Sequence, residues 1–215
     1  MKITSLFFAI LLSLSSFSQN DTKAMSILKK VSQEYKSYKN VAIQFVLTME
    51  NAQEDIKESS KGQAWVKDKK YKVNLMGVET YYNGKTKWSY IKDSEEVNIT
   101  TPDPADKNTF DPSKLFTEYE QGYKVRYINE VFQANRALQI IDLLPTDVKG
   151  SEFNRIKIKV DKDKNQIYQI IRFGKDGNDY TITLSSLKKV NPIADSFFIF
   201  DTKKHPDVEV VDLRD

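Results

Sequence analysis

The chain has 215 residues, and 33 Lys and Arg against 30 Asp and Glu give it a formal net charge of +3. Because both signs are interspersed along the chain, the charges indicate a solvated surface and exclude the basic footprint of a nucleic-acid-binding protein. There is no cysteine, which excludes a thiol nucleophile, an iron–sulfur cluster, a cysteine zinc site and a lipid anchor on the chain's own cysteine.

The first 18 residues have the pattern of a secretory signal peptide. Lys2 precedes the apolar run 3–14, and Ser16 and Ser18 are the small residues expected before a cleavage site. A membrane anchor would need about 20 apolar residues, which is more than this run supplies. The sequence therefore predicts export, cleavage after Ser18 and a single mature domain over residues 19–215.

An amphipathic helix is predicted directly after the cleavage site. Asp21 or Thr22 can cap it, and we expect it to stop near Asn40. The residues that form its apolar stripe are Ala24, Ile27, Leu28, Val31, Tyr35 and Tyr38. Alternating large side chains over residues 41–49 then predict a long first strand, and the charged, serine-rich residues 51–60 predict a turn.

Residues 62–99 are predicted to form short antiparallel strands with large side chains on one face. The spacing has the two-residue period of a half-buried strand. Asn83-Gly84 offers the positive φ angles of a tight hairpin. A sheet with an aromatic-rich face must cover it with a second sheet, a helix or a ligand. The side chains that we expect on this face are Tyr71, Val73, Leu75, Trp88 and Tyr90.

The strand pattern breaks at residues 101–104, where two prolines cannot donate to a ladder. Asp111-Pro112 follows, with the features of a helix N-cap and a first-turn proline. The predicted helix ends near Gly122 and carries Leu115, Phe116 and Tyr119. A helix this short is marginal without packing, so we interpret it as a movable flap.

Strands resume in the second half of the chain. Asp176-Gly177 marks another hairpin turn, and residues 197–211 predict two last short strands. The longer segments are 123–132, 138–144, 155–160, 167–173 and 180–184. With about ten antiparallel strands, the chain is predicted to be mainly β, as a strongly curved sheet or open barrel with an N-terminal helix and a mid-chain helical insertion.

Nothing in the sequence predicts an enzyme. His205 is the only histidine, and no second group is spaced to orient it. The series Asp161, Asp163, Asn165 resembles a calcium loop, but Gln166 stands where that loop needs glycine. The chain has no glycine-rich phosphate loop. We therefore predict no catalytic residue, no metal and no cofactor.

Several sequence pieces, in this order and spacing, resemble the family of periplasmic outer-membrane lipoprotein carriers (LolA). The pieces are Gly62-Gln63-Ala64-Trp65-Val66-Lys67, Asn83-Gly84-Lys85-Thr86-Lys87-Trp88-Ser89-Tyr90, Asn191-Pro192-Ile193-Ala194, Phe198-Ile199-Phe200 and His205-Pro206-Asp207-Val208-Glu209-Val210. The resemblance implies an incomplete antiparallel β-barrel around an apolar cavity, with helices that cover it. It also implies a monomeric periplasmic chaperone for acylated lipoproteins, served by an inner-membrane lipoprotein-releasing transporter and an outer-membrane acceptor.

The physical demands on such a carrier agree with an apolar-faced sheet. A lipoprotein anchor has roughly three acyl chains and some 45 methylenes, so exposing it to water costs on the order of 35 kcal/mol. A carrier must offer these chains a wide apolar site and still release them. The alternatives are a lipid-sensing domain, a structural or interaction module, and a carrier of another amphiphile.

Under the carrier hypothesis, apolar side chains of the strands line the cavity and the mid-chain helix covers it. The predicted lining is Val41, Ile43, Phe45, Leu47, Tyr71, Val73, Leu75, Trp88 and Tyr90, and the predicted lid residues are Leu115, Phe116 and Tyr119. The alternative is that these residues form ordinary core.

The resemblance fails at the residues that would latch the lid. Proteobacterial members have an Arg-Pro after the strand that corresponds to residues 62–67, and that arginine holds the lid shut in the empty form. Here the stretch is Asp68-Lys69-Lys70. Lys69 or Lys70 could donate to lid carbonyls, but only as a point donor and not as a planar fork.

Overall fold

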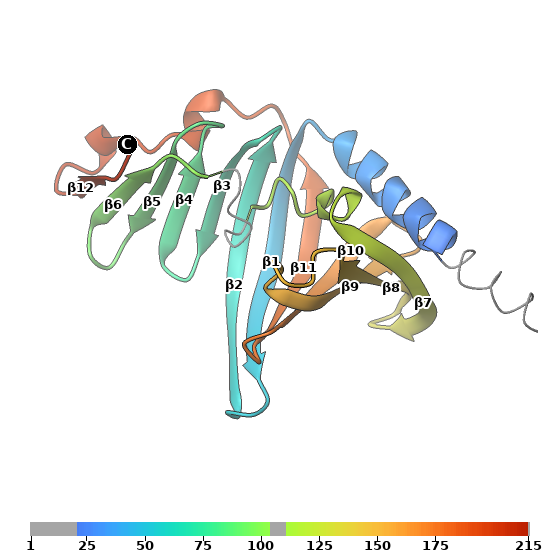
Figure 1. The fold of residues 1–215 in the computed structure, drawn as a ribbon. Coiled ribbons are helices and arrows are strands. Elements are labelled where there is room, and N and C mark those ends of the chain that lie inside the picture. Colours follow the sequence, from blue (N-terminus) through green and yellow to red (C-terminus); the bar gives the residue numbers. More distant parts are fainter. Residues whose placement is uncertain (1–20, 104–110, 215) are drawn as a thin grey trace, which may run out of the picture. The chain divides into compact units, whose positions relative to one another are not determined.

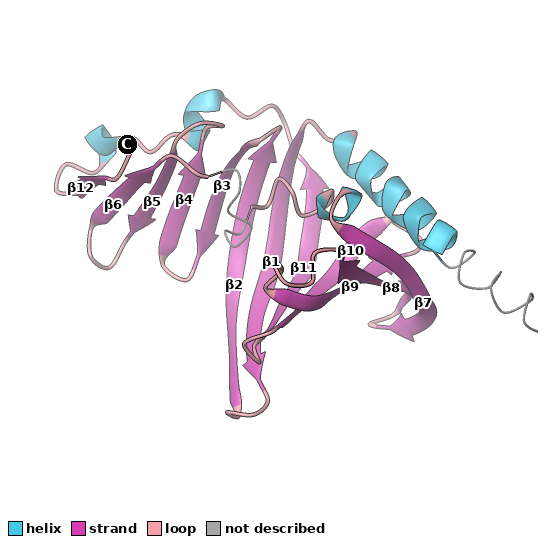
Figure 2. Cartoon of the chain, in the orientation of Figure 1, coloured by secondary structure: helices cyan, strands magenta, loops and turns pink. Residues whose placement is uncertain are grey.

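The structure is a computed structural model that describes residues 21–103 and 111–214, so the predicted signal peptide lies outside the described residues. Figure 2 shows that strands dominate. Within the described residues one α-helix, the N-terminal helix, covers residues 21–36. The short 3₁₀ helices there are η1 (Glu118–Glu120), η2 (Asp195–Phe198) and η3 (Thr202–Lys204). The strands are β1 (Asn40–Asn51), β2 (Ile56–Lys67), β3 (Lys70–Leu75), β4 (Val78–Tyr82), β5 (Lys87–Ile91), β6 (Glu96–Thr100), β7 (Tyr123–Gln133), β8 (Arg136–Pro145), β9 (Phe153–Asp161), β10 (Gln166–Gly174), β11 (Asp179–Lys189) and β12 (Glu209–Asp212).

The N-terminal helix buries most of its predicted apolar stripe. The helix ends at residue 36, so Tyr38 lies beyond it and is only half-buried, and Asn40 already opens β1. The buried members of the stripe are Ala24, Ile27, Leu28, Val31 and Tyr35. The 3.6-residue period therefore predicted the buried face correctly, because packing of that face is what stabilises a surface helix.

The strands form an open sheet in the order β12-β6-β5-β4-β3-β2-β1-β11-β10-β9-β8-β7 (Figure 1). The mainly β, unclosed architecture is as predicted. Its twelve strands exceed the expected number, and β12 pairs with β6 in parallel rather than antiparallel. The turn predicted over residues 51–60 is also too long, because β2 begins at Ile56. Most side chains of residues 56–61 are exposed, so this part of β2 has no hydrophobic period to identify it.

By their contacts, the residues fall into two compact units. The first unit contains the N-terminal helix, Glu50–Ile56 and Phe116–Thr181, and the second contains Ser37–Met49, Lys57–Leu115 and Ile182–Asp215. The single mature domain over residues 19–215 stays a prediction. No helix among the described residues has the length and apolar composition needed to cross a membrane.

The core of the first unit lies where the N-terminal helix meets one face of β7–β10. The ammonium group of Lys23 sits 3.6 Å from the ring centre of Tyr127 in β7, which marks the face that the helix covers. The buried strand residues of this core are Val125, Tyr127, Ile141, Leu143, Ile156, Ile158, Val160, Ile167 and Ile170.

Candidate functional site

In the second unit, strand register divides the predicted cavity lining between two faces of the sheet. Tyr71 pairs with Tyr82, and Tyr82 pairs with Lys87. Opposed residues share a face and successive residues alternate, so Tyr71 and Trp88 lie on opposite faces. The prediction that the residues around Tyr71 and those around Trp88 form one wall is therefore wrong. The Tyr71 face carries Ala64, Val66, Tyr71, Val73, Leu75, Val78, Tyr82 and Ile91, and the Trp65 face carries Trp65, Lys72, Tyr81, Trp88, Tyr90, Val97 and Ile99.

On the Tyr71 face, the Phe45 ring of β1 lies over Gly62 of the neighbouring strand β2. A Cβ atom at Gly62 would lie 2.3 Å from Cζ of Phe45, closer than any real side chain could approach. The glycine that opens the first family-like sequence piece therefore leaves room for the Phe45 ring. The residues buried on this side are Val41, Ile43, Phe45, Ala64, Val66, Tyr71 and Val73.

The Tyr71 face continues as a half-buried apolar strip. Leu75, Val78 and Ile91 stand opposite one another on β3, β4 and β5. Each is half-buried, as is Leu47 on β1. The sequence pattern predicts Leu47 and Leu75 but not Val78 and Ile91. Their chain neighbours Glu79 and Tyr90 lie on the Trp65 face. Because successive strand residues alternate between faces, counting along each strand could have placed Val78 and Ile91 on the Tyr71 face.

The mid-chain segment (residues 111–122) begins beside the Tyr71 face. Burial, with the nearby Asp111 carboxylate second, raises the pKa of the Tyr71 hydroxyl. Asp111 Oδ1 accepts hydrogen bonds from the backbone nitrogen (2.9 Å) and the hydroxyl (2.6 Å) of Ser113. Asp111 thus caps a turn as predicted, but no α-helix follows. The segment is a series of turns that ends in the 3₁₀ helix η1 (Figure 2), so the insertion is helical only there and the longer helix predicted from Pro112 is wrong.

The predicted lid residues are all buried, and they divide between the two units. Leu115 belongs to the second unit and is 4% exposed. Phe116 belongs to the first unit, where it is fully buried and stacks on Tyr35 of the N-terminal helix with ring centres 4.1 Å apart. The Tyr119 hydroxyl donates to the carbonyl oxygen of Leu28 in the same helix. Phe116 and Tyr119 are therefore core residues of the first unit in this structure.

Electrostatic contacts secure the end of the mid-chain segment to the same helix. The Glu120 carboxylate accepts hydrogen bonds from the Ser32 hydroxyl at 2.9 Å and from the Lys36 ammonium at 2.8 Å. The Lys36 bond, followed by the Ser32 bond, lowers the pKa of Glu120. Both contacts hold η1 against the N-terminal helix.

The Trp65 face is covered by the C-terminal segment (residues 191–208). Phe200 packs with Tyr81 and Val97 in a buried cluster, against which Trp88 and Tyr90 also pack. The His205 ring stacks on Phe200 with centroids 4.8 Å apart. Protein side chains therefore contact Trp88 and Tyr90 on this face, so we assign these two residues to packing rather than to the lining of a cavity.

Two lysines of the β2–β3 hairpin hold the C-terminal segment in place. Lys67 Nζ donates to the Ile193 carbonyl at 2.9 Å and lies 2.8 Å from the Asp195 carboxylate. Lys70 Nζ lies 2.7 Å from the other oxygen of Asp195. These two bonds, with that of Lys67 the larger, lower the pKa of Asp195 to about 2. Lys70, a predicted latch residue, thus fastens the C-terminal segment and not the mid-chain segment; Lys69 is exposed in the turn.

Glu79 joins three donors on the Trp65 face. Its carboxylate lies 2.7 Å from Lys92 Nζ and 3.0 Å from Lys72 Nζ, and accepts the Tyr81 hydroxyl at 2.5 Å. Burial alone would raise the pKa of Glu79, but the bonds from Lys92, Tyr81 and Lys72 outweigh it and lower the pKa to about 2.

This arrangement predicts an acid-sensitive contribution to stability. Because the pKa of Glu79 is lower in the folded chain than its ordinary value of 4.5, its stabilising effect is present above that value and is lost as pH falls toward about 2. The Glu79→Gln variant should show a smaller loss of unfolding free energy between about pH 5.5 and about pH 3, measured by urea denaturation. Glu58→Gln, at an exposed position of β2, should lose as much unfolding free energy as the wild type over this pH range. Equal losses in all three proteins would contradict the assignment of the effect to Glu79.

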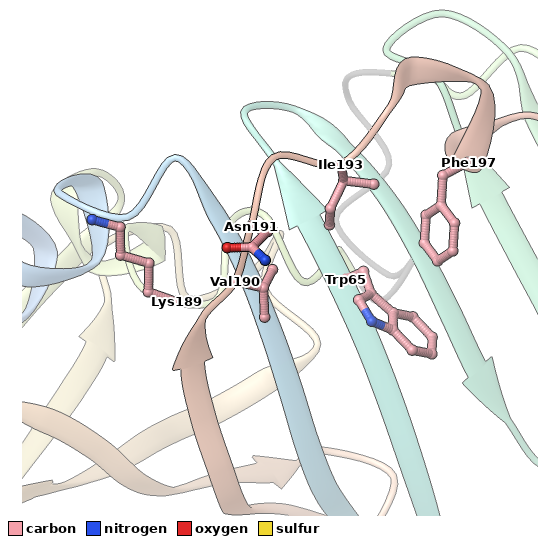
Figure 3. Close-up of a pocket in the computed structure, with 6 residues that line it drawn as sticks. All are labelled: Trp65, Lys189, Val190, Asn191, Ile193 and Phe197. Carbon is pink, nitrogen blue, oxygen red and sulfur yellow. The ribbon is translucent and has the colours of Figure 1, made fainter.

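A pocket opens on the Trp65 face beside the C-terminal segment (Figure 3). Its volume is about 480 Å³. The Trp65 and Phe197 rings meet edge to face, 5.5 Å apart, and form one wall. The residues that line it are Trp65, Lys189, Val190, Asn191, Ile193 and Phe197. Trp65 lies within a family-like sequence piece, but the sequence pattern does not predict this pocket.

The described residues contain no group of three or more histidine or acidic side chains placed to hold a metal ion. His205 is committed to the aromatic cluster with Phe200 and Tyr90.

Comparison with known proteins identifies the family and the fold. The family model described as "Outer membrane lipoprotein carrier protein LolA" matches residues 14–140, which is more than half of the chain. No curated protein matches the chain. An uncharacterized conserved protein from Thermus thermophilus has a similar structure, with a TM-score of 0.59 at 12% identity over 88% of this chain and 99% of that one.

Two looser structural likenesses have TM-scores below 0.5. A LolA superfamily protein from Nitrosomonas europaea has a TM-score of 0.45 at 10% identity, over 82% of this chain and 97% of that one. LprF from Mycobacterium bovis has a TM-score of 0.45 at 17% identity, over 80% and 98%. At these identities, structural likeness alone says nothing of what this chain binds.

Proposed function

Because the chain belongs to the LolA family of outer membrane lipoprotein carrier proteins, we propose that it binds the acyl chains of lipoproteins and carries them through the periplasm to the outer membrane. The observation that supports this function best is the apolar Tyr71 face, which runs from buried core into the half-buried strip of Leu75, Val78 and Ile91. The apolar side chains that continue along β3 from Tyr71 through Val73 to Leu75 suit a floppy hydrocarbon cargo, which needs area and few polar anchors.

The proposed binding site combines the half-buried strip with the buried residues beside it. Acyl chains first contact Leu47 and the strip, where side chains are already partly open to solvent. Further binding area lies under the start of the mid-chain segment, next to Tyr71. We propose residues 111–115 as the movable cover. The buried part of the proposed site consists of Val41, Ile43, Phe45, Tyr71 and Val73.

We propose that Trp88 and Tyr90 act indirectly. By packing against Phe200 they hold the C-terminal segment on the Trp65 face, away from the acyl chains. Such packing keeps β4 and β5 rigid under the apolar strip, and a rigid scaffold places a binding surface better than a mobile one.

The cellular route belongs to the same proposal. Export by a cleaved signal peptide over residues 1–18 would place the mature protein in the periplasm. An inner-membrane releasing transporter would supply acylated lipoproteins, and an outer-membrane acceptor would receive them.

The proposal is tested by release of cargo from a membrane. Mature protein is incubated with membranes that hold a labelled triacylated lipoprotein, and the soluble fraction is separated by size. We expect a soluble one-to-one complex, because capture removes on the order of 45 methylenes from water. If folded protein leaves all of the lipoprotein in the membrane, the proposal is overturned. Uptake of free fatty acid without uptake of lipoprotein would mean that the protein carries another amphiphile.

A further inference from the structure

Basic side chains gather on the outer face of the first unit. Arg126 in β7 stands opposite Asp142 in β8, which stands opposite Lys157 in β9. Because successive residues alternate, Lys124 shares this face with Arg126, while Arg155 and Lys159 share it with Lys157. We call this side of β7–β9 the basic face. Its cationic residues are Lys124, Arg126, Arg155, Lys157 and Lys159.

The basic face lies on the opposite side of the sheet from the N-terminal helix, and two of its apolar residues, Leu138 and Ile140, are buried as well. The intervening residues Ile156 and Ile158 are buried on the other side, which the N-terminal helix covers. Lys124 and Arg126 are exposed, and the three basic residues of β9 are half-buried. Of the half-buried ones, Arg155 keeps 36% of its side chain exposed. Long cationic side chains at an interface commonly bury their stems in this way.

Acidic groups do not balance these charges. Asp142 is buried beneath them, 3.3 Å from Arg155 and 3.6 Å from Arg126. Asp161 also lies on this face, but Arg136 pairs with it at 3.0 Å. Asp179 at the start of β11 also attracts one of these cations, Arg155. Five cations against the carboxylates of Asp142 and Asp179 thus leave an excess of three positive charges. Other acids of the first unit, such as Asp147 and Asp163, lie in turns.

An aromatic ring of the neighbouring strand packs against two of these cations. The Phe173 ring in β10 lies 4.2 Å from the Arg155 guanidinium and 5.8 Å from the Lys157 ammonium. Burial, and after it the repulsion from Lys157, lowers the pKa of Lys159. The face therefore holds like charges close together, and an anionic surface would relieve their repulsion.

We propose that the basic face docks onto membrane surfaces rich in anionic phospholipid. Its cationic side chains project from the same face of neighbouring strands, and such strands lie about 4.8 Å apart. A plane of phosphate groups can meet them together, and each lysine or arginine near such a surface adds to binding. A peptide that extended the sheet would bind along the edge of β7 and would leave most of these cations unused.

Membrane docking of this face is a property separate from acyl-chain binding. The basic face belongs to the first unit, whereas the apolar strip belongs to the second. Vesicles without any lipoprotein therefore test it, and its failure would leave the proposed carrier function untouched.

The experiment measures sedimentation of the mature protein with vesicles. Vesicles of phosphatidylcholine with phosphatidylglycerol are compared with phosphatidylcholine alone, at low and high salt. We expect binding only to the anionic vesicles, and weakening by salt. The double variant Lys157→Glu/Lys159→Glu should bind on the order of tenfold or more weakly, because both attractions become repulsions.

A matched variant separates the face from total charge. Lys61→Glu/Lys85→Glu makes the same change in net charge at exposed positions of the second unit and should bind like the wild type. Equal loss in both double variants would overturn the assignment to this face. Binding to polyglutamate without binding to anionic vesicles would overturn it in favour of an acidic protein partner, and circular dichroism confirms that each variant is folded.

Discussion

The Val78→Glu variant is expected to stay folded and to lose capture of acylated lipoprotein by on the order of a hundredfold. Val78 is half-buried in the middle of the apolar strip, between Leu75 and Ile91. The empty protein can leave a carboxylate at this position partly in water, whereas an acyl chain laid along the strip would bury it. Desolvating an unpaired carboxylate costs several kcal/mol, and each 1.4 kcal/mol or so is tenfold in affinity.

Two control variants make this measurement specific. Val78→Leu keeps the strip apolar and should retain capture. Phe132→Glu adds the same charge at a side chain that is 77% exposed in the first unit, and should also retain it. Capture is measured as soluble complex formed from membranes that hold labelled lipoprotein, with thermal unfolding as the check on folding. Wild-type capture by Val78→Glu would remove the strip from the proposed binding site.

The sequence predicted elements well where one surface decides the pattern. The N-terminal helix is an example, because its stripe needs only a 3.6-residue period and one face to cover. The strands around Tyr71 and Trp88 were likewise identified by their alternation. Alternation does not say which faces of successive strands coincide, since that depends on the length of every turn between them.

The predicted cavity lining is divided between two faces because of the turns that join its strands. Leu75 pairs with Val78 across the two-residue turn Met76-Gly77, and both turn residues have positive φ angles of 52° and 78°. This is the backbone of a type I′ hairpin with methionine where asparagine or aspartate is usual, so the sequence gives no signal for it. At the next turn only Gly84 has positive φ, and the loop extends over residues 83–86. Both turns have an even number of residues, which places Trp88 opposite Tyr81 and away from Tyr71.

The mid-chain segment failed as a helix for a different reason. Leu115, Phe116 and Tyr119 have the spacing of a helical stripe, but a stripe forms only when one surface accepts all its members. Here Leu115 is buried in the second unit, and Phe116 and Tyr119 are buried in the first. Local propensity over so few residues is weak, and tertiary contacts of individual side chains decide the backbone.

Phe116→Ala is expected to lower the unfolding free energy by about 3–5 kcal/mol. The Phe116 side chain is fully buried, and its stacking on Tyr35 joins the mid-chain segment to the N-terminal helix. Its removal forfeits the transfer free energy of the ring and leaves a cavity that the helix can only partly fill. The loss is measured by urea denaturation, followed by circular dichroism.

Phe132→Ala is the matched control, since that ring is 77% exposed and its loss should change stability by about 0.5 kcal/mol or less. If the two variants unfold alike, Phe116 is not a core residue and the mid-chain segment is free to move as a whole. The opposite result would be a much lower unfolding free energy for Phe116→Ala than for Phe132→Ala, with Leu115→Ala still able to capture lipoprotein. It would mean that opening of the mid-chain segment is confined to the residues before Phe116. In that case the cover of the apolar face is the short stretch 111–115, hinged where the chain enters the core of the first unit.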